Sequence, residues 1–235
     1  KRDIDSVNSE LILHDLIFIE KRFERLDKKV KETKEEASIK EKDLLAKLKT
    51  HLDKEAPLRT LGISADDRKG LASYPFLTRK EMIIVLNVSE DQLKSMPLVE
   101  GDNMMQVSAK VEAEIAGLES ERERKEFLAA LGIEEPAINI LTRLCLCTLK
   151  LVSFFTVGPD EVRQWNVRAG STASEAAGTI HSDLEKGFIR AELIKFDDIK
   201  ELGGEDAVRA QGKFYLKGKE YIVEDGDILS IRFNV

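Results

Sequence analysis

The sequence predicts a mixed fold class, α+β with α/β, in which an antiparallel helical hairpin, part of a parallel α/β sheet and a small β-grasp sheet follow one another. Three observations support this prediction. Apolar residues recur at helical spacing in a charged opening, short apolar strands precede helix-like sequence in the middle, and short strands surround one helix at the end. The predicted domains are residues 1–76, 77–152 and 153–235.

The first segment places apolar side chains three and four residues apart among charged ones. They are Leu16, Ile19, Phe23, Leu26 and Val30 in one run, and Leu45, Leu48 and Leu52 in the next. This spacing predicts two coiled-coil arms between Val7 and Leu52, the first about 35 Å long, with the reversal in the polar stretch "KETKEEAS". The charged surface has two interpretations, a solvated face or a partner-binding face.

The middle segment contains two candidate strands, "MIIVL" and "MMQVSAK". Each is followed by helix-like sequence, "SEDQLKSM" and "VEAEIAGLESERERKEFLAAL". The first strand is uniformly apolar, so we expect it to be buried. Because two strands are too few for a doubly wound sheet, we expect this segment to be the last part of a larger domain.

The last segment alternates short strands with one helix. "SFFTV" and "VRQWNV" resemble a hairpin, and "STASEAAGTIHSDLEKG" has a Ser/Thr start and a Gly stop for a helix. "FYLKGKEYIVEDGDILSIRFNV" predicts three further strands with turns at Gly218 and Gly226. A β-grasp sheet crossed by a helix fits this pattern.

Composition narrows the class of protein. A net charge of −7 argues against wholesale polyanion binding, although a local basic patch remains compatible with it. Cys145 and Cys147 are too close to link distant segments, so we interpret them as reduced core thiols in a helix. Three scattered histidines suggest no zinc site. No apolar run approaches the ~20 residues of a membrane span, so we expect a cytoplasmic protein without membrane contact.

Several stretches resemble one family. "DIDSVNSELILHDL", "NVSE", "VSAKVEAEI", "PDEVRQWNVRAGSTASEAAGTIHSDLEKGFIRAE" and "GKEYIVEDGDILSIRFNV" are similar to the YchF-type Obg-like ATPases, of the P-loop GTPase class. The resemblance implies a P-loop NTPase (G) domain interrupted by a coiled-coil hairpin and followed by a TGS domain of β-grasp, ubiquitin-like fold. The middle segment would then be the carboxyl-terminal remnant of the G domain.

The resemblance also suggests a nucleotide site. GTPases of this class contact guanine through Asn-Lys-x-Asp, whereas this chain has "NVSE", which resembles the family variant that accompanies ATP. It implies that Asn87, Val88 and Glu90, with Ser108 and Ala109 of "SAK", line the adenine pocket. The alternative interpretation is that the Asn and the Glu cap the following helix.

No phosphate-binding loop of the form Gly-x4-Gly-Lys-Ser/Thr occurs in the sequence. "DRKG", residues 67–70, matches Asp-x-x-Gly of a magnesium-side switch but follows no apolar strand, so we interpret it as coincidence. The resemblance therefore implies that ATP and Mg belong to a longer parent ATPase, a hydrolase. We expect this chain alone to be inactive and to bind ATP weakly if at all.

The TGS-like segment implies contact with RNA or the ribosome. Its candidate phosphate-binding residues are Lys186, Arg190, Lys213, Lys217 and Lys219, with Phe188, Phe214 and Tyr215 available for base stacking. The alternative is that the rings are core residues and the cations are ordinary surface. We expect His181 to be a structural hydrogen-bonding residue. Two hypotheses follow, part of an ATPase or a nucleotide-independent ribosome-binding module.

Overall fold

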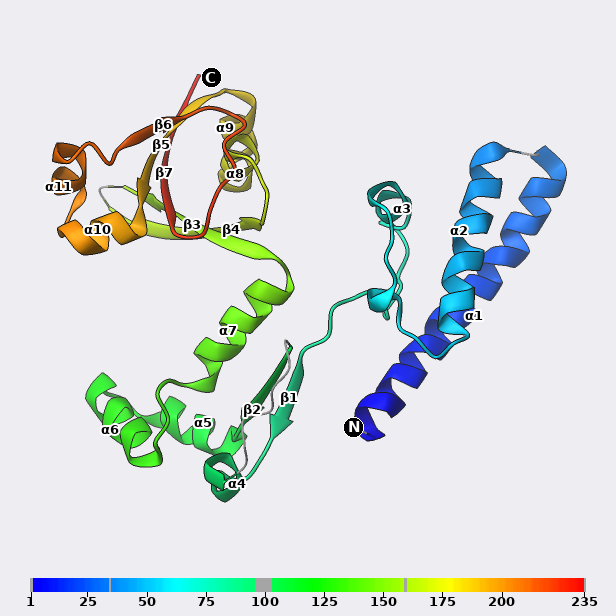
Figure 1. The fold of residues 1–235 in the computed structure, drawn as a ribbon, viewed down its shortest axis with the longest axis horizontal. Coiled ribbons are helices and arrows are strands. Elements are labelled where there is room, and N and C mark those ends of the chain that lie inside the picture. The colour runs from blue at the N-terminus through cyan, green and yellow to red at the C-terminus, as the bar shows by residue number, and fades with distance from the viewer. Residues whose placement is uncertain (1, 34, 96–102, 159, 235) are drawn as a thin grey trace. The chain divides into compact units, whose positions relative to one another are not determined.

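The computed structural model describes residues 2–33, 35–95, 103–158 and 160–234 (Figure 1). The chain divides into two compact units, one ending at Met82 and the other beginning at Ile83. Each unit has a hydrophobic core of its own. Within the described ranges, none of the helices combines the length and the apolar character needed to cross a membrane.

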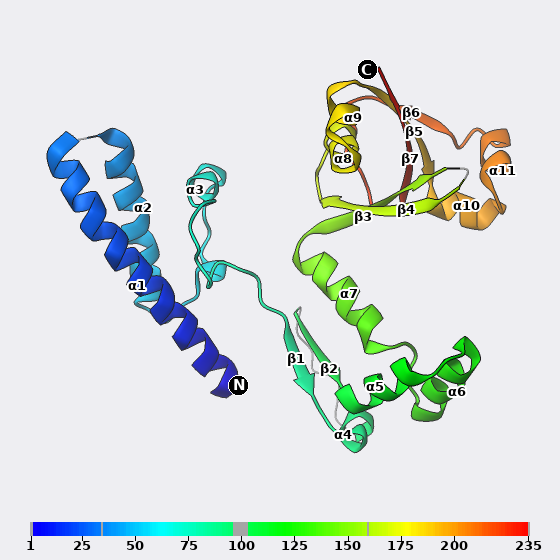
Figure 2. The same cartoon turned by 180° about the vertical axis from the view of Figure 1, so that it is seen from behind.

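The first unit is built on two long helices that lie side by side, α1 (Arg2–Thr33) and α2 (Glu36–Leu52) (Figures 1 and 2). Ion pairs join Glu20 to Lys49 at 3.8 Å and Lys29 to Glu35 at 2.6 Å, so the two arms run in opposite directions. The predicted antiparallel hairpin is confirmed, and α1 begins before Val7. The buried seam consists of Ile12, Ile19, Leu26, Leu45, Leu48 and Leu52.

A connecting segment folds back onto the hairpin. It contains a 3-10 turn (Leu58–Thr60) and the short helix α3 (Ala65–Gly70), and it buries Leu58, Leu71 and Phe76 in the hairpin core. Since α3 includes residues 67–70 and is capped by the Ser64 side chain, the "DRKG" stretch is helical.

The segment is fastened to α1 by one carboxylate. Asp15, which is fully buried, accepts hydrogen bonds from the backbone N–H groups of Leu77 (2.9 Å) and Thr78 (2.8 Å) and from the Thr78 hydroxyl (2.7 Å). A buried carboxylate is tolerated when several donors satisfy it. The charge of Asp15 therefore specifies where the connecting segment docks.

The second unit opens with two parallel strands, β1 (Ile84–Asn87) and β2 (Met104–Val107). The helix α4 (Glu90–Ser95) follows β1. Both predicted strands are present, but the expectation that β1 is buried is wrong, because Val85 is 42% exposed. Within the described residues β1 pairs only with β2, so a large part of its apolar surface has no covering layer.

Three helices follow β2: α5 (Ala109–Gly117), α6 (Glu121–Leu131) and α7 (Ala137–Thr148). The helix-like sequence after β2 is divided between α5 and α6 because Ser120 and Glu123 form a capping box that starts a new helix. α5 and α6 pack through a small core of Val111, Ile115 and Leu128.

Both cysteines lie on α7 and are free thiols. Cys145 is half-buried and Cys147 is exposed. The prediction of core thiols is therefore wrong for Cys147. The reason is that the half-buried face of α7 contains Leu141, Leu144, Cys145 and Thr148, whereas Cys147 lies off this face.

The carboxyl-terminal part is a five-stranded mixed sheet in the order β4-β3-β7-β5-β6. Its strands are β3 (Leu151–Val157), β4 (Val162–Arg168), β5 (Phe188–Lys195), β6 (Tyr215–Lys217) and β7 (Asp227–Phe233). β7, the last strand in sequence, lies in the centre, parallel to β3 and antiparallel to β5. The β-grasp prediction is confirmed, except that the middle strand predicted near Tyr221 is reduced to an isolated bridge at Ile222.

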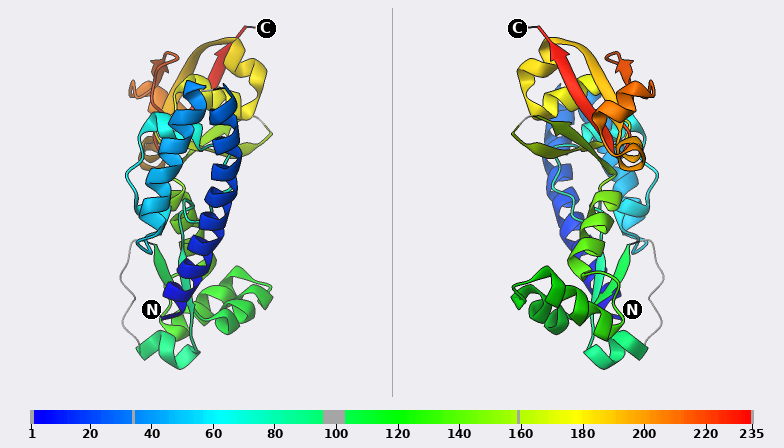
Figure 3. Two further views of the ribbon diagram at one scale, coloured as in Figure 1. Left: turned by 90° about the vertical axis from the view of Figure 1, so that its right-hand side faces the viewer. Right: turned by 90° about the vertical axis from the view of Figure 1, so that its left-hand side faces the viewer.

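Helices cover this sheet unequally (Figures 1 and 3). α8 (Ala173–Ile180) buries Ala173, Ala176 and Ala177 against one face, whereas α10 (Phe196–Leu202) and α11 (Glu205–Ala210) lie toward the other.

The single helix predicted over residues 171–187 is two helices, because His181 is extended and begins α9 (Ser182–Lys186). The His181 ring nitrogen Nδ1 accepts a hydrogen bond from the Asp183 N–H at 3.2 Å, which confirms a structural role.

One buried ion pair anchors the sheet. The Lys195 ammonium lies 2.6 Å from Asp227, a fully buried carboxylate that also accepts from the Tyr221 hydroxyl (2.9 Å) and the Glu224 N–H (2.9 Å). This network ties the end of β5 to the start of β7. It fixes the central strand in register with its neighbour.

Candidate functional site

The two loops assigned to the nucleotide lie at one edge of the β1–β2 sheet. Asn87 is the last residue of β1 and pairs with Val107, the last residue of β2. The carboxyl ends of parallel strands form the ligand-binding edge of α/β sheets. The backbone N–H of Ala109 donates to the Asn87 carbonyl oxygen Oδ1 at 3.0 Å, and the N–H of Val88 donates to the Val107 carbonyl at 2.8 Å. The structure thus joins the two predicted loops directly.

The Asn87 side chain is oriented by this contact. Its Oδ1 is occupied by Ala109, and its Nδ2 group makes no hydrogen bond to any residue that the structure describes. The residue is exposed. An amide whose oxygen accepts one backbone N–H has a fixed orientation, and its NH₂ group keeps two donors for a ligand. Asn87 therefore offers two donors at the strand edge.

The helix after β1 is capped by other residues. The Ser89 hydroxyl accepts from the Gln92 N–H at 3.3 Å, and the Gln92 side-chain oxygen accepts from the Ser89 N–H at 3.0 Å. This reciprocal pair caps α4, so Asn87 is not the cap of that helix; its side-chain oxygen instead accepts from Ala109, the first residue of α5. The spacing Ser-x-x-Gln is a capping-box signal that the sequence contained. Glu90 is half-buried and is the first residue of α4.

The other candidate residues of this edge differ in exposure. Ser108 is buried at 3% exposure and precedes α5, while Ala109 is exposed and Val88 is half-buried. Polar backbone groups and one amide fit a nucleobase. In the described part of the chain no three His, Cys, Asp or Glu side chains gather as a metal-ligand group. The candidate residues thus supply one side-chain amide, one hydroxyl and one carboxylate beside neutral backbone groups.

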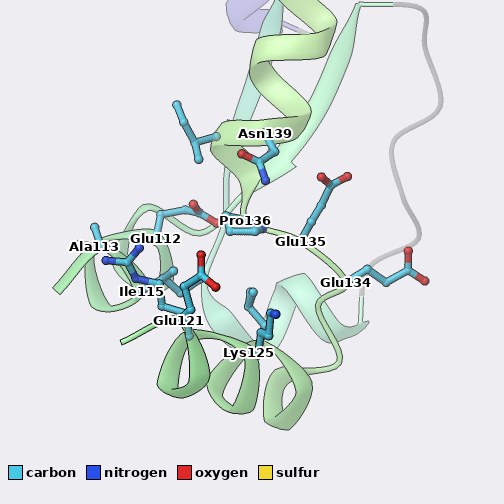
Figure 4. A pocket seen from close by; sticks show the side chains of 13 residues that line it. Glu112, Ala113, Ile115, Glu121, Lys125, Glu134, Glu135, Pro136 and Asn139 are labelled. Carbon is cyan, nitrogen blue, oxygen red and sulfur yellow. The ribbon is translucent and has the colours of Figure 1, made fainter. Parts of the chain in front are cut away.

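A separate cavity of about 940 Å³ lies between α5, α6 and the start of α7 (Figure 4). Glu112 on its wall accepts a hydrogen bond from the Ala137 N–H at 2.9 Å, which holds α5 to α7. Glu121, Glu134 and Glu135 also line it. None of the predicted base-side residues does, so this cavity is distinct from the candidate nucleotide site.

The predicted RNA-contacting cations of the β-grasp sheet differ in their availability. Lys213 lies 2.8 Å from Asp198 and 3.6 Å from Glu201, and the hydrogen bond to Asp198 raises the pKa of Lys213. Lys186 lies 3.9 Å from Asp183, and Lys219 is exposed. Lys213 therefore already faces two carboxylates of its own chain.

The remaining predicted cations do not share a face. Arg190 is opposite Arg232 across β5 and β7, whereas Lys217 is opposite Ala191, the residue next to Arg190. Because adjacent strand residues point to opposite faces, Arg190 and Lys217 lie on different sides of the sheet. Of the three aromatic candidates, Phe188 is buried in the core, Phe214 stacks under the Arg209 guanidinium (3.9 Å) and Tyr215 is 41% exposed.

Comparison with known proteins gives consistent matches. The family model YchF-GTPase_C, described as "Protein of unknown function (DUF933)", matches residues 151–234. The chain is 41% identical to the ribosome-binding ATPase YchF of Haemophilus influenzae and 40% identical to that of Bacillus subtilis, over 99% of this chain and 66% of each relative. It is 35% identical to Obg-like ATPase 1 of Oryza sativa, over 100% of this chain and 62% of the relative.

A solved structure also matches this chain over almost its whole length. The YchF GTPase of Schizosaccharomyces pombe superposes with a TM-score of 0.86 at 30% identity, over 98% of this chain and 65% of that one. The fold and the matches define a protein of the P-loop GTPase class. Within that class, the chain belongs to the YchF-type family of Obg-like ATPases. It spans slightly less than two thirds of the length of these relatives.

Proposed function

We propose that this chain supplies the base-binding side of an ATP site. The observation that carries the proposal is the hydrogen bond from the Ala109 N–H to Asn87 Oδ1, which turns the Asn87 amide donors outward. Purines carry an acceptor at N7. Asn87 donates to that atom, and the Val88 carbonyl accepts from the exocyclic amine of adenine.

Selectivity for adenine arises at the contact between the Val88 carbonyl and the exocyclic amine. N7 is an acceptor in both purines, so Asn87 holds either base. Adenine has an N6 amine where guanine has the O6 acceptor. A backbone carbonyl at Val88 therefore favours adenine, and Glu90 keeps the loop in place and disfavours guanine. ATP is bound in preference to GTP.

Hydrolysis requires groups that lie outside these residues. The sequence contains no Gly-x4-Gly-Lys-Ser/Thr stretch to hold phosphates and Mg. We infer that the phosphate-binding and Mg-binding groups belong to a longer parent protein, in which residues 77–152 complete the P-loop domain. The 235-residue chain alone does not turn over ATP, and it binds ATP weakly because phosphate contacts are missing.

The same protein associates with the ribosome in the cytoplasm through its accessory domains. Two relatives carry the name ribosome-binding ATPase, which supports this part of the proposal. The accessory domains are the coiled-coil hairpin of residues 1–76 and the TGS domain of residues 153–235. If the chain binds ribosomes equally with and without ATP, a nucleotide-independent binding module is the better description.

The base site is tested by NMR titration of the ¹⁵N-labelled chain with ATP and, separately, GTP. We expect the Asn87 side-chain amide signals to shift with ATP at lower concentration than with GTP. In the variant N87D one carboxylate oxygen still accepts from Ala109, but the donors to N7 are lost, so the shifts of neighbouring signals disappear. K110Q, on the exposed side of α5, is the control. Equal responses to both nucleotides, or an unaffected N87D, contradict the proposal.

A further inference from the structure

A small basic cavity lies between α1 and the connecting segment. Its volume is about 270 Å³, and it is lined by Phe18, Lys21, Arg22, Arg25, Ser73 and Tyr74. Three of these six side chains are cationic and none is acidic. In a chain with a net charge of −7, such a site is a local exception that requires an explanation.

Two of the three cations have no counterion. Arg22 donates to Glu41 at 2.6 Å, so its charge is satisfied within the hairpin. Lys21 and Arg25 are exposed and form no ion pair with any residue in the described part of the chain. Their charges therefore remain available to an anionic ligand.

Lys28 extends the basic face beyond the cavity. Lys21, Arg25 and Lys28 are spaced by four and three residues on α1, so they lie on one face of the helix. At 1.5 Å per residue the row is about 10 Å long. Glu24 and Glu32 are the acidic neighbours of the row at helical spacing on α1, and Glu24 does not line the cavity. The arrangement is a line of positive charge rather than a single point.

The cavity wall is aromatic and fixed. The rings of Phe18 and Tyr74 meet edge to face at 5.7 Å, and Tyr74 stacks on Phe76 at 5.6 Å. The Tyr74 hydroxyl donates to Glu41. These contacts hold Tyr74 and the neighbouring Ser73 against α1. The site is therefore preorganised for a ligand that has both negative charge and an apolar face.

We propose that this cavity and the row Lys21–Arg25–Lys28 bind the phosphate backbone of single-stranded RNA. A row of cations beside aromatic rings matches a single-stranded RNA, in which phosphates repeat along the strand and bases stack on aromatic side chains. A single phosphate, as on a phosphoprotein, would occupy only the cavity and would leave the rest of the row unused. This inference rests on the proposed function in one respect, because the ribosome association proposed above supplies the biological source of the RNA. It assigns the RNA contact to the hairpin, where Lys21 and Arg25 are unpaired.

The test measures binding of a fluorescein-labelled 12-nucleotide RNA of mixed sequence to the 235-residue chain by anisotropy between 50 and 200 mM KCl. The variant K21Q/R25Q/K28Q should bind about tenfold or more weakly. Its slope of log affinity against log salt should be smaller by about 2, since each phosphate contact contributes about 0.7 on single strands. The control K40Q/K47Q/K54Q removes the same charge from α2 and the residues after it, and should bind within about twofold of the parent chain.

Co-sedimentation with purified ribosomes separates this inference from the proposed function. If the unsubstituted 235-residue chain binds the RNA through the row but does not sediment with ribosomes, only the proposed ribosome association is contradicted. Equal RNA binding by the parent chain and the K21Q/R25Q/K28Q variant overturns the inference. The inference is also overturned if both triple variants bind the RNA equally weakly, because net charge alone then explains the binding. If the K21Q/R25Q/K28Q variant loses ribosome binding but keeps its RNA affinity, the inference is also overturned, and the row contacts a ribosomal protein instead.

Discussion

Thr78 donates two hydrogen bonds to the buried carboxylate of Asp15, from its backbone N–H at 2.8 Å and from its hydroxyl at 2.7 Å. The two residues lie far apart in sequence, so this contact closes the whole first unit. The carboxylate carries a charge inside the hairpin core, and the three donors from Leu77 and Thr78 compensate for its removal from water.

Asp15→Asn tests this contact. The substituted amide nitrogen cannot accept, so at least one buried donor of the connecting segment loses its partner. We expect a loss of about 2–3 kcal/mol in the free energy of unfolding of the first unit, measured by urea denaturation. The control is Asp53→Asn, at a half-exposed residue after α2. A loss below about 0.5 kcal/mol contradicts the assignment.

Lys195→Met tests the buried ion pair of the sheet. The substitution leaves Asp227, which is fully buried, without its cation. We expect a loss of about 2–3 kcal/mol, since the buried carboxylate then keeps only the donors from Tyr221 and Glu224. Lys200→Met, on the exposed side of α10, should change stability by less than about 0.5 kcal/mol. Thermal unfolding of the two variants side by side decides between these outcomes.

Glu41 makes the hairpin sensitive to acid. Burial raises the pKa of Glu41, but hydrogen bonds from Arg22 and Tyr74 outweigh it, and the net pKa is lowered. The stabilisation is therefore complete above the ordinary pKa of about 4.3 and is lost as pH falls through the lower folded-state value. Urea midpoints between pH 7 and 3 should fall for the parent chain. Glu41→Gln should be less stable at pH 7 and flatter with pH, and parallel profiles would refute this account.

The paired substitution V88K/E90D restores the Asn-Lys-x-Asp pattern in the loop after β1. A shorter carboxylate at residue 90 is expected to accept from the two donors of guanine, so preference should move from ATP toward GTP. The same NMR titration measures it, and we expect a change of about tenfold in the ratio of affinities. K110Q is again the control. An unchanged ratio indicates that this loop does not select the base.

His181 caps α9, and its substitution should affect stability alone. His181→Ala removes the acceptor of the Asp183 N–H and should cost about 1 kcal/mol. His181→Asn supplies a side-chain oxygen and should recover most of this loss. RNA and nucleotide binding should stay unchanged in both variants, and a selective loss of either would point to a role that the geometry does not indicate.

Local patterns predicted the main elements well. The three- and four-residue spacing of Leu45, Leu48 and Leu52 correctly predicts one arm of the hairpin, because each of these residues is buried in the seam. The family resemblance implied that Asn87 and Ala109 lie together, and the parallel pairing of β1 and β2 explains why they do.

Contacts that depend on tertiary structure were not predictable. Asp15 resembles a solvated charge in the sequence, and only the docking of Thr78 explains its burial. The separation of Arg190 from Lys217 required the register of β5 with its neighbours. Cys147 was expected to be buried because its segment is apolar, yet its exposure depends on which surfaces cover α7.

The position of β7 affects how this chain folds during synthesis. β7 is the central strand, between β3 and β5, yet it is the last of these five strands to be translated. The β3–β4 hairpin can form early, because its connection is short. The β5–β6 pair has no partner until β7 emerges and bridges the two halves. The sheet therefore closes only after β7 has been synthesised, and a nascent chain stalled before Asp227 carries two unattached half-sheets.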